Sequence, residues 1–248
     1  MIGTWINVAT VVAGTVAGRL LGGRLRPETQ HTVTDALGCV TLLLGMQNGL
    51  ARPAAVSSGT LDAQLGFFLC VLLGILIGAL IGEAIDIEKR LADLGQWAEA
   101  RFKATDGDFG RGFVISSLVF CVGPLTVLGS FQDGLNGDFS MLATKSVLDF
   151  FSSMAFAAAF GWGVLLSVMT VIVVQGSLTL GAGFFQHIMT DVVIGAMTSA
   201  GGIILIGMGF RLLNVKQVRA ANLLPALVLA PLFTAVLGSL VPGLFGGS

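Results

Sequence analysis

Charged side chains are scarce in this chain, because Asp, Glu, Lys and Arg make up only 11% of its 248 residues. A soluble globular domain carries about 25% of such residues, whereas 54% of this chain is hydrophobic. The net charge is −1, so the chain also lacks the concentrated basic surface that binds nucleic-acid phosphates. The composition therefore predicts a lipid bilayer as the main surroundings of the protein, and no nucleic acid as a partner.

Cysteine and the residues of known catalytic motifs are also sparse. Cys39, Cys70 and Cys121 lie in three different apolar segments, without a Cys-x-x-Cys or Cys/His spacing. This pattern is typical of small buried hydrophobic residues. The sequence has no HExxH motif, nucleophile elbow or phosphate-binding loop. We therefore expect no enzyme activity, no metal and no cofactor.

The chain consists instead of long apolar segments, most of them long enough to cross a bilayer. A hydrocarbon core about 30 Å thick needs roughly 20 helical residues. Helices are predicted because backbone groups in lipid must pair within the segment and the alternating pattern of a membrane barrel is absent. The segments are 2–22, 36–50, 65–85, 112–131, 140–183, 188–210 and 222–242. The predicted fold class is an all-α polytopic membrane bundle of seven or eight spans, with 1–248 as a single transmembrane domain.

Segment 140–183 decides between seven and eight spans. As one helix it would be about 66 Å long, roughly twice the hydrocarbon core. Gly161-Trp162-Gly163 is the best place for a break. Two spans, 140–160 and 164–183, keep all basic segments on the cytoplasmic side and both termini outside. A single broken helix gives seven spans and remains the alternative.

Internal similarities indicate repeats. Gly14, Gly18 and Gly22 recur as Gly74, Gly78 and Gly82, and segment 44–50 resembles 128–135. We interpret 1–50 and 65–138 as two repeats, with a weaker and inverted third within 140–213. Because glycines at four-residue spacing let helices approach closely in lipid, we expect a homo-oligomer, a dimer, joined through one of these glycine ladders.

Segment 86–105 has the pattern of a helix that lies in the plane of the membrane surface. Its apolar side chains fall on one helical face and its charged side chains surround the rest. A cytoplasmic connector helix is the alternative. Tyrosine is absent, so Trp5, Trp97 and Trp162 are the candidates for anchors at the membrane surface.

Polar residues within the apolar segments are the candidates for function. Lys145, Asp149, Ser152 and Ser153 share one stripe of a helix that begins near Ser140. Asp149 lies well inside this membrane segment, and a carboxylate inside a membrane span predicts a proton-binding or cation-binding site. The alternative is a structural ion pair between Lys145 and Asp149.

Two further polar pairs end the repeated segments. Gln47 and Asn48 correspond to Gln132 and Asp133, and each pair is followed by Gly-Leu. They predict two related polar helix ends that face one cavity. The alternative is that these are helix C-terminal caps, with the following glycines in the left-handed conformation.

The apolar segments also contain a Gly-Pro pair and two isolated amides. Gly123-Pro124 predicts a break that frees backbone carbonyls, or a kink without further role. Asn7 and Gln175 are single amides that predict interhelical hydrogen bonds.

Several motifs resemble the YdfK/YqgA family of bacterial inner-membrane proteins. They are Gly3-Thr4-Trp5-Ile6-Asn7, Phe120-Cys121-Val122-Gly123-Pro124 with the following 128–135, and Lys145-Ser146-x-x-Asp149. The resemblance covers nearly the whole chain and implies a multi-pass protein of the bacterial inner membrane. The family has no known function, so the resemblance implies neither a substrate nor a functional residue.

Two functions fit these features. The first is a transporter or channel-like protein for a cation or small polar solute, with a polar site between repeated helices. The second is a structural or regulatory membrane protein that docks a partner through the 86–105 helix. A water-accessible cavity that reaches the middle of the membrane beside Asp149 favours the first function, and a dry, fully paired interior favours the second.

Overall fold

A computed structural model describes the chain except for residues 23–26, 103–108, 122–123, 186–188, 242 and 246–248. The described residues form helices joined by short loops, and no strand occurs among them. The helices are α1 Ile2–Gly22, α2 Pro27–Gly49, α3 Ala54–Ser57, α4 Leu61–Ile85, α5 Ile87–Phe102, α6 Phe109–Cys121, α7 Pro124–Asn136, α8 Ser140–Phe160, α9 Gly163–Phe185, α10 Asp191–Leu212, the 3-10 helix η1 Ala220–Leu223 and α11 Ala226–Leu240.

Five helical stretches are long and apolar enough to cross a membrane: α1, α4, α9, α10, and η1 together with α11. Helices α6 and α7 count as a sixth if they form one broken span, and they are bent by 59° where the sequence predicts the Gly123-Pro124 break. Gly123 itself lies outside the described residues. Helix α8 has the length of a span, but its lysine, aspartate and serines lower its hydropathy. The all-helical membrane fold is thus shown, while the count of seven or eight spans stays a prediction.

Helices α8 and α9 form a hairpin, as the sequence predicts. Helix α8 ends at Phe160, and the chain turns at Gly161 with φ 75°, a positive value that glycine adopts without strain. Gly129 of α7 contacts the start of α8, and Gly134 contacts the last turns of α9. The start of α8 and the end of α9 therefore lie beside the same helix, α7.

The glycine ladders pack inside the chain. Gly14, Gly18 and Gly22 of α1 lie against the backbone of α8, so that a Cβ atom at any of them would collide with it. The second ladder, Gly74 to Gly82 of α4, lies in the same way against α11 and η1. The prediction that a ladder joins two copies of the chain is therefore wrong, because both glycine faces are already covered.

The two ladders differ in direction. Helix α1 runs parallel to α8, with Gly3 at Leu142 and Gly22 at Ala158. Helix α4 runs antiparallel to α11, with Gly74 at Ala230. The proposed repeats thus use the same small-residue surface against partners of opposite direction, and the repeats themselves stay a prediction.

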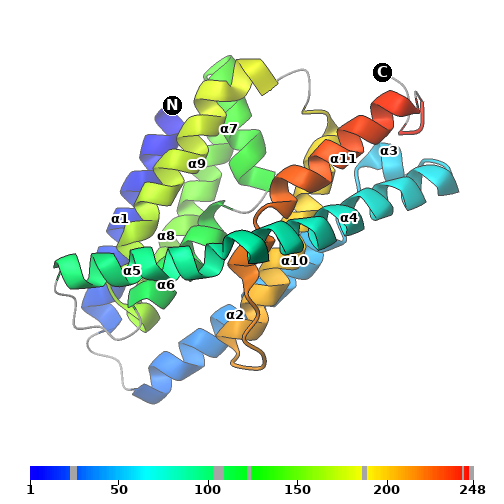
Figure 1. The fold of residues 1–248 in the computed structure, drawn as a ribbon. Helices are drawn as coiled ribbons and strands as arrows, with labels where there is room; N and C mark the ends of the chain where they lie inside the picture. Colours follow the sequence, from blue (N-terminus) through cyan, green and yellow to red (C-terminus); the bar gives the residue numbers. More distant parts are fainter. Residues whose placement is uncertain (23–26, 103–108, 122–123, 186–188, 242, 246–248) are drawn as a thin grey trace.

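The helices form two groups (Figure 1). Helices α1 and α6 to α9 pack together on one side, and α2, α3, α4, α10 and α11 on the other. Ile204, Met208 and Leu212 of α10 are buried against Phe113 and Phe156 of the first group. Helix α10 thus belongs to one group and supplies core side chains to the other.

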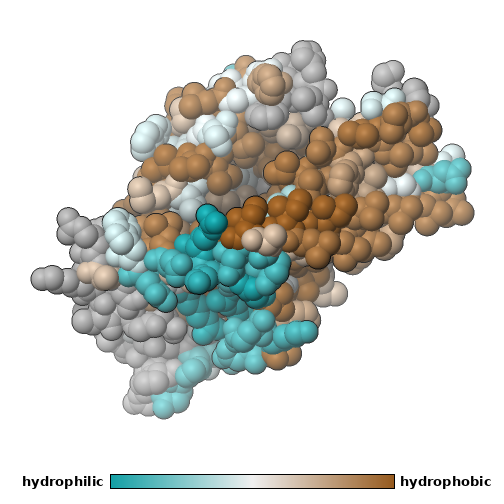
Figure 2. Space-filling model, viewed as in Figure 1, coloured by the Kyte–Doolittle hydropathy of each residue, from teal (hydrophilic) through white to brown (hydrophobic). Residues whose placement is uncertain are grey.

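The surface separates into an apolar and a polar part. Figure 2 shows apolar side chains along α4 and α11 and hydrophilic side chains around α5. Helix α5 forms where the amphipathic segment 86–105 predicts it. Positions 103–105 of that segment lie outside the described residues. Trp5 and Trp97 are 60% and 63% exposed, which fits the anchoring role expected of them.

Candidate functional site

The buried face of α8 carries an ion pair between Lys145 and Asp149. Both residues are only 6% exposed. Ser153 lies on the same buried stripe, but its hydroxyl donates to the Phe150 carbonyl of its own helix at 2.9 Å. Ser152 is half-buried. The predicted stripe is therefore present, and its two charges satisfy each other.

Two side chains from other helices lie beside this pair. The amide of Asn7, from α1, interacts with the Asp149 carboxylate, although it makes no hydrogen bond of ordinary geometry with the described residues. Cys121, at the end of α6, lies near both charges and beside Thr170 of α9. The ion pair thus stands where α1, α6 and α9 meet α8, next to the break between α6 and α7.

Several buried polar atoms of the helices around this pair have no partner among the described residues. Nearly all buried polar groups in proteins are hydrogen-bonded to protein, water or ligand, so each of these atoms has unused bonding capacity. All of them belong to α1, α7 or α9. The residues are Thr4, Asn7, Thr15, Ser130, Gln132, Gln175 and Thr179.

The unpartnered groups line the interior that α1, α7, α8 and α9 share. These four helices contact one another in every pairing. On α9 the polar residues Gln175 and Thr179 are one turn apart, and both are buried. Asn7 and Gln175 are fully buried, and neither amide makes a hydrogen bond of ordinary geometry with the described residues. The predicted interhelical contact of Asn7 is thus its approach to Asp149, whereas that of Gln175 is not found in the described part of the chain.

Asp133 is buried at the end of α7, where it holds the start of α1. Its Oδ2 accepts a hydrogen bond from the Gly3 backbone N–H at 3.2 Å and lies 2.9 Å from the Met1 nitrogen. A carboxylate at a helix N-terminus pairs with otherwise unsatisfied N–H groups. Asp133 is therefore fully engaged in positioning α1.

Gln132 points to the loop after α7. Its Nε2 donates to Asp138 at 2.7 Å. The pKa of the Asp138 carboxyl is lowered, chiefly by a hydrogen bond from the Ser140 backbone and also by one from the Ser140 side chain. Helix α7 continues through Gly134 to Asn136, and Gly137 is the residue with positive φ. The alternative of a left-handed cap at Gly134 is therefore wrong, and Gly49 likewise has no positive φ.

Gln47 and Asn48 lie in the other group of helices. Helix α2 packs on α10 and, to a lesser extent, on α8, whereas α7 packs on α8 and α9. Gln47 is exposed and Asn48 is half-buried. The structure thus brings Lys145 and Asp149 together, but it does not bring Gln47 and Asn48 to Gln132 and Asp133.

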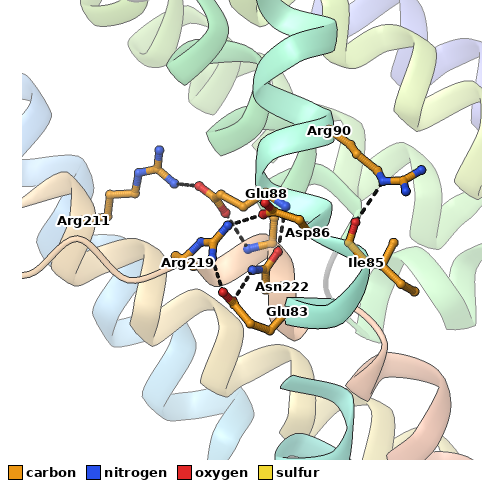
Figure 3. A network of polar contacts seen from close by, with 9 residues as sticks. Glu83, Ile85, Asp86, Glu88, Arg90, Arg211, Arg219 and Asn222 are labelled. Atoms are coloured by element: carbon orange, nitrogen blue, oxygen red, sulfur yellow. Dashed lines mark hydrogen bonds and ion pairs between the residues drawn. The ribbon is translucent and has the colours of Figure 1, made fainter. Parts of the chain in front are cut away.

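A second polar cluster joins α4 and α5 to the end of α10 and to the chain from there through η1 (Figure 3). We call this end of the molecule, which carries Arg211 and Arg219, the basic end. Arg211 pairs with Glu88, and Arg219 pairs with Glu83 and Asp86. Asn222 donates to Glu83 at 2.6 Å and accepts from the Glu88 N–H at 2.7 Å.

In the sequence, the basic segments indicate only which side of the membrane they face. The one local signal in the sequence is that an acidic stretch ends one apolar segment and a basic stretch precedes another. The partners are more than 120 positions apart, so their pairing could not be predicted from spacing along the chain. Among the described residues, no three His, Cys, Asp or Glu side chains come together in a way that could hold a metal ion.

Comparison with known proteins agrees with the helical membrane architecture. A profile of the family described as "Protein of unknown function (DUF554)" matches residues 2–235. The "Uncharacterized membrane protein YdfK" of Bacillus subtilis (strain 168) is 28% identical over 237 residues, 96% of this chain and 97% of that protein. The "Uncharacterized protein YqgA" of Escherichia coli (strain K12) is 30% identical over 235 residues, 93% of this chain and 94% of that protein. No solved structure matches the chain.

Proposed function

We propose that this chain, which belongs to the DUF554 family of proteins of unknown function, moves a small polar solute or cation across the membrane. Its apolar helices and the membrane relative make it a multi-pass membrane protein. The proposed path is the interior shared by α1, α7, α8 and α9. The observation that carries the proposal is the buried Lys145–Asp149 pair, with the Asn7 amide beside it and the Gln175 amide without a partner among the described residues.

The physical reason is the free-energy cost of burying polar groups without hydrogen-bond partners in a membrane protein. A buried amide without a partner costs about 1–3 kcal/mol, and ionisable groups at membrane depth usually lie on a path for ions, protons or substrate. A bundle that only had to stay folded would be more stable with apolar residues at positions 7 and 175. Their presence supports a role in binding a molecule that bonds to them.

The charges at the site favour a solute without net charge over a cation. Among the described residues of α1, α7, α8 and α9, the acids are Asp133 and Asp149, and both are engaged. A cation would have to displace Lys145 from Asp149. Amides and hydroxyls both donate and accept hydrogen bonds, so a neutral or zwitterionic solute with hydroxyl or amide groups can bind without breaking the ion pair.

A thermal-shift screen followed by a flux assay tests the proposal. The purified protein is screened against Na⁺, K⁺, Mg²⁺, polyols, amino acids and small amides, because a ligand that binds only the folded state raises apparent stability. Each solute that stabilises the protein is then measured for uptake into proteoliposomes. We expect a stabilising neutral solute with saturable uptake.

Matched variants decide whether this interior is the path. Asn7→Leu should remove both the thermal shift and the uptake, whereas Ser177→Ala, an exposed position on α9, should retain both. Stabilisation without uptake would indicate a sensor in place of a transporter. Equal uptake by the two variants would refute the assignment of the path to this interior.

A docking role through α5 is the second candidate function. Leu94 and Trp97 of α5 are 46% and 63% exposed, although the helix also packs on α6 and η1. Exposed apolar residues on an amphipathic helix can bind a membrane surface or a partner helix. A Leu94→Ser/Trp97→Ser variant with unchanged uptake but lost association with a partner would favour this function.

A further inference from the structure

One face of helix α2 is uncovered from Ala36 to the end of the helix. The opposite face packs on α10 through Gly38 and Gly45. The uncovered face carries exposed side chains with the alternating spacing of four and three residues that forms the seam of a two-helix coiled coil. These residues are Ala36, Val40, Leu43, Gln47 and Leu50.

Gln47 of this seam lies at membrane depth. Gly45 contacts α10 at Ile206, and Gly49 lies beside Gly202, so Gln47 is level with the stretch between them. At 1.5 Å per residue, this stretch is roughly 9–15 Å from the end of α10 at Leu212. Helix α10 is itself a candidate span. The amide of Gln47 is therefore well inside the hydrocarbon region.

An amide that faces lipid at this depth has no hydrogen-bond partner, and such a group costs several kcal/mol in hydrocarbon. Leucine residues on either side of it, Leu43 and Leu50, are 67% and 72% exposed, so the seam is otherwise apolar. A single polar residue within an apolar helix seam is typical of a helix–helix contact that fixes register.

We propose that a second copy of this chain covers the face, with α2 packed against α2 about a two-fold axis along the membrane normal. Membrane orientation makes the two α2 helices parallel, so each seam residue meets its own counterpart. The Gln47 side chain carries both a donor and an acceptor, and two such amides at one depth satisfy each other. The proposal does not rest on the transport function.

Cysteine cross-linking in native membranes tests this dimer. In a background of Cys39→Ser, Cys70→Ala and Cys121→Ala, Leu43→Cys places a thiol on the seam. Leu80→Cys is the matched control, because Leu80 of α4 is 72% exposed and lies away from the seam. Oxidation should convert most of the Leu43→Cys protein to a covalent dimer and leave the Leu80→Cys protein monomeric.

The role of the amide is tested by adding Gln47→Leu to the Leu43→Cys protein. The loss of one interhelical pair of this kind should weaken association about 3- to 30-fold, measured by dilution of the protein in lipid. Equal cross-linking at positions 43 and 80 would overturn the dimer, because it would indicate random collision. Unchanged dimerisation with Gln47→Leu would overturn the amide contact. Labelling of Leu43→Cys by a membrane-impermeant maleimide, without cross-linking, would show a water-filled crevice and also overturn the proposal.

Discussion

Asp149 forms an ion pair with Lys145 one turn earlier on α8, and the Asn7 amide of α1 lies beside this pair. Two charges that face lipid would be costly, but here each charge has its counter-charge within the same helix. The pair can therefore be carried into the membrane by α8 alone. Asn7 then meets the preformed pair when α1 packs on α8.

We expect Asp149→Asn to destabilise the protein, because it leaves the Lys145 ammonium buried without a counter-charge. The expected cost is about 3–5 kcal/mol, and the double variant Lys145→Met/Asp149→Asn should recover most of it. Thermal unfolding in detergent measures both. If the double variant is stable but no longer responds to the solute found by screening, the pair is part of the binding site. A retained response would limit the pair to a structural role.

Gln175→Leu should be neutral or stabilising. Both polar atoms of this buried amide lack a partner among the described residues, and an apolar side chain of similar size avoids the cost of about 1–3 kcal/mol for such atoms. The same variant should lose solute binding. A loss of stability above about 2 kcal/mol would show that Gln175 is bonded within the folded protein. Melting temperature and solute response measured on the same sample separate the two results.

Gly18→Ala should destabilise the fold by about 1–3 kcal/mol, because its Cβ would overlap the backbone of α8 at Met154. Gly183→Ala is the matched control, since a Cβ at this position of α9 meets nothing within 4 Å. Alanine there should leave stability unchanged or raise it by up to about 1 kcal/mol. Because the ladder is internal, native mass spectrometry should find the same oligomer in both variants.

At the basic end, Glu88→Gln should cost more than Glu83→Gln. The Glu88 side chain is 14% exposed and bonds both Arg211 and the Ala221 N–H, so we expect a loss of about 1.5–3 kcal/mol. The Glu83 side chain is 57% exposed, and solvent screening should limit its loss to about 1 kcal/mol or less. Unfolding of both variants in low and high salt checks this, because only the Glu83 pair should weaken strongly with salt.

The features predicted correctly from the sequence depend on neighbouring residues. The break at Gly161 follows from the flexibility of glycine and from a segment twice too long for one span. The buried stripe of Lys145 and Asp149 follows from helical spacing within α8. Helix α5 follows from the distribution of charge along sixteen residues.

The features that the sequence did not reveal depend on which helix packs on which. A glycine ladder has the same spacing whatever helix it meets, so Gly18 and Gly78 gave no sign that their partners are in the same chain. The same limit applies to polar residues. Asn7 and Gln175 suggested hydrogen bonds between helices, and only the packing of the helices shows that Asn7 faces Asp149 and that Gln175 has no partner among the described residues.

The order of synthesis gives the glycine contacts a further consequence. Helices α1, α2 and α4 leave the ribosome before α8, α10 and α11, the helices on which they pack. The small-residue face of each therefore stays without its partner helix in the membrane until the second half of the chain is inserted. A chain truncated before residue 220 would leave α4 without its partner, whatever the state of the other helices. The packing of α4 is therefore completed only when α11 is inserted, and termination before α11 should yield products that are inserted in the membrane but not fully packed.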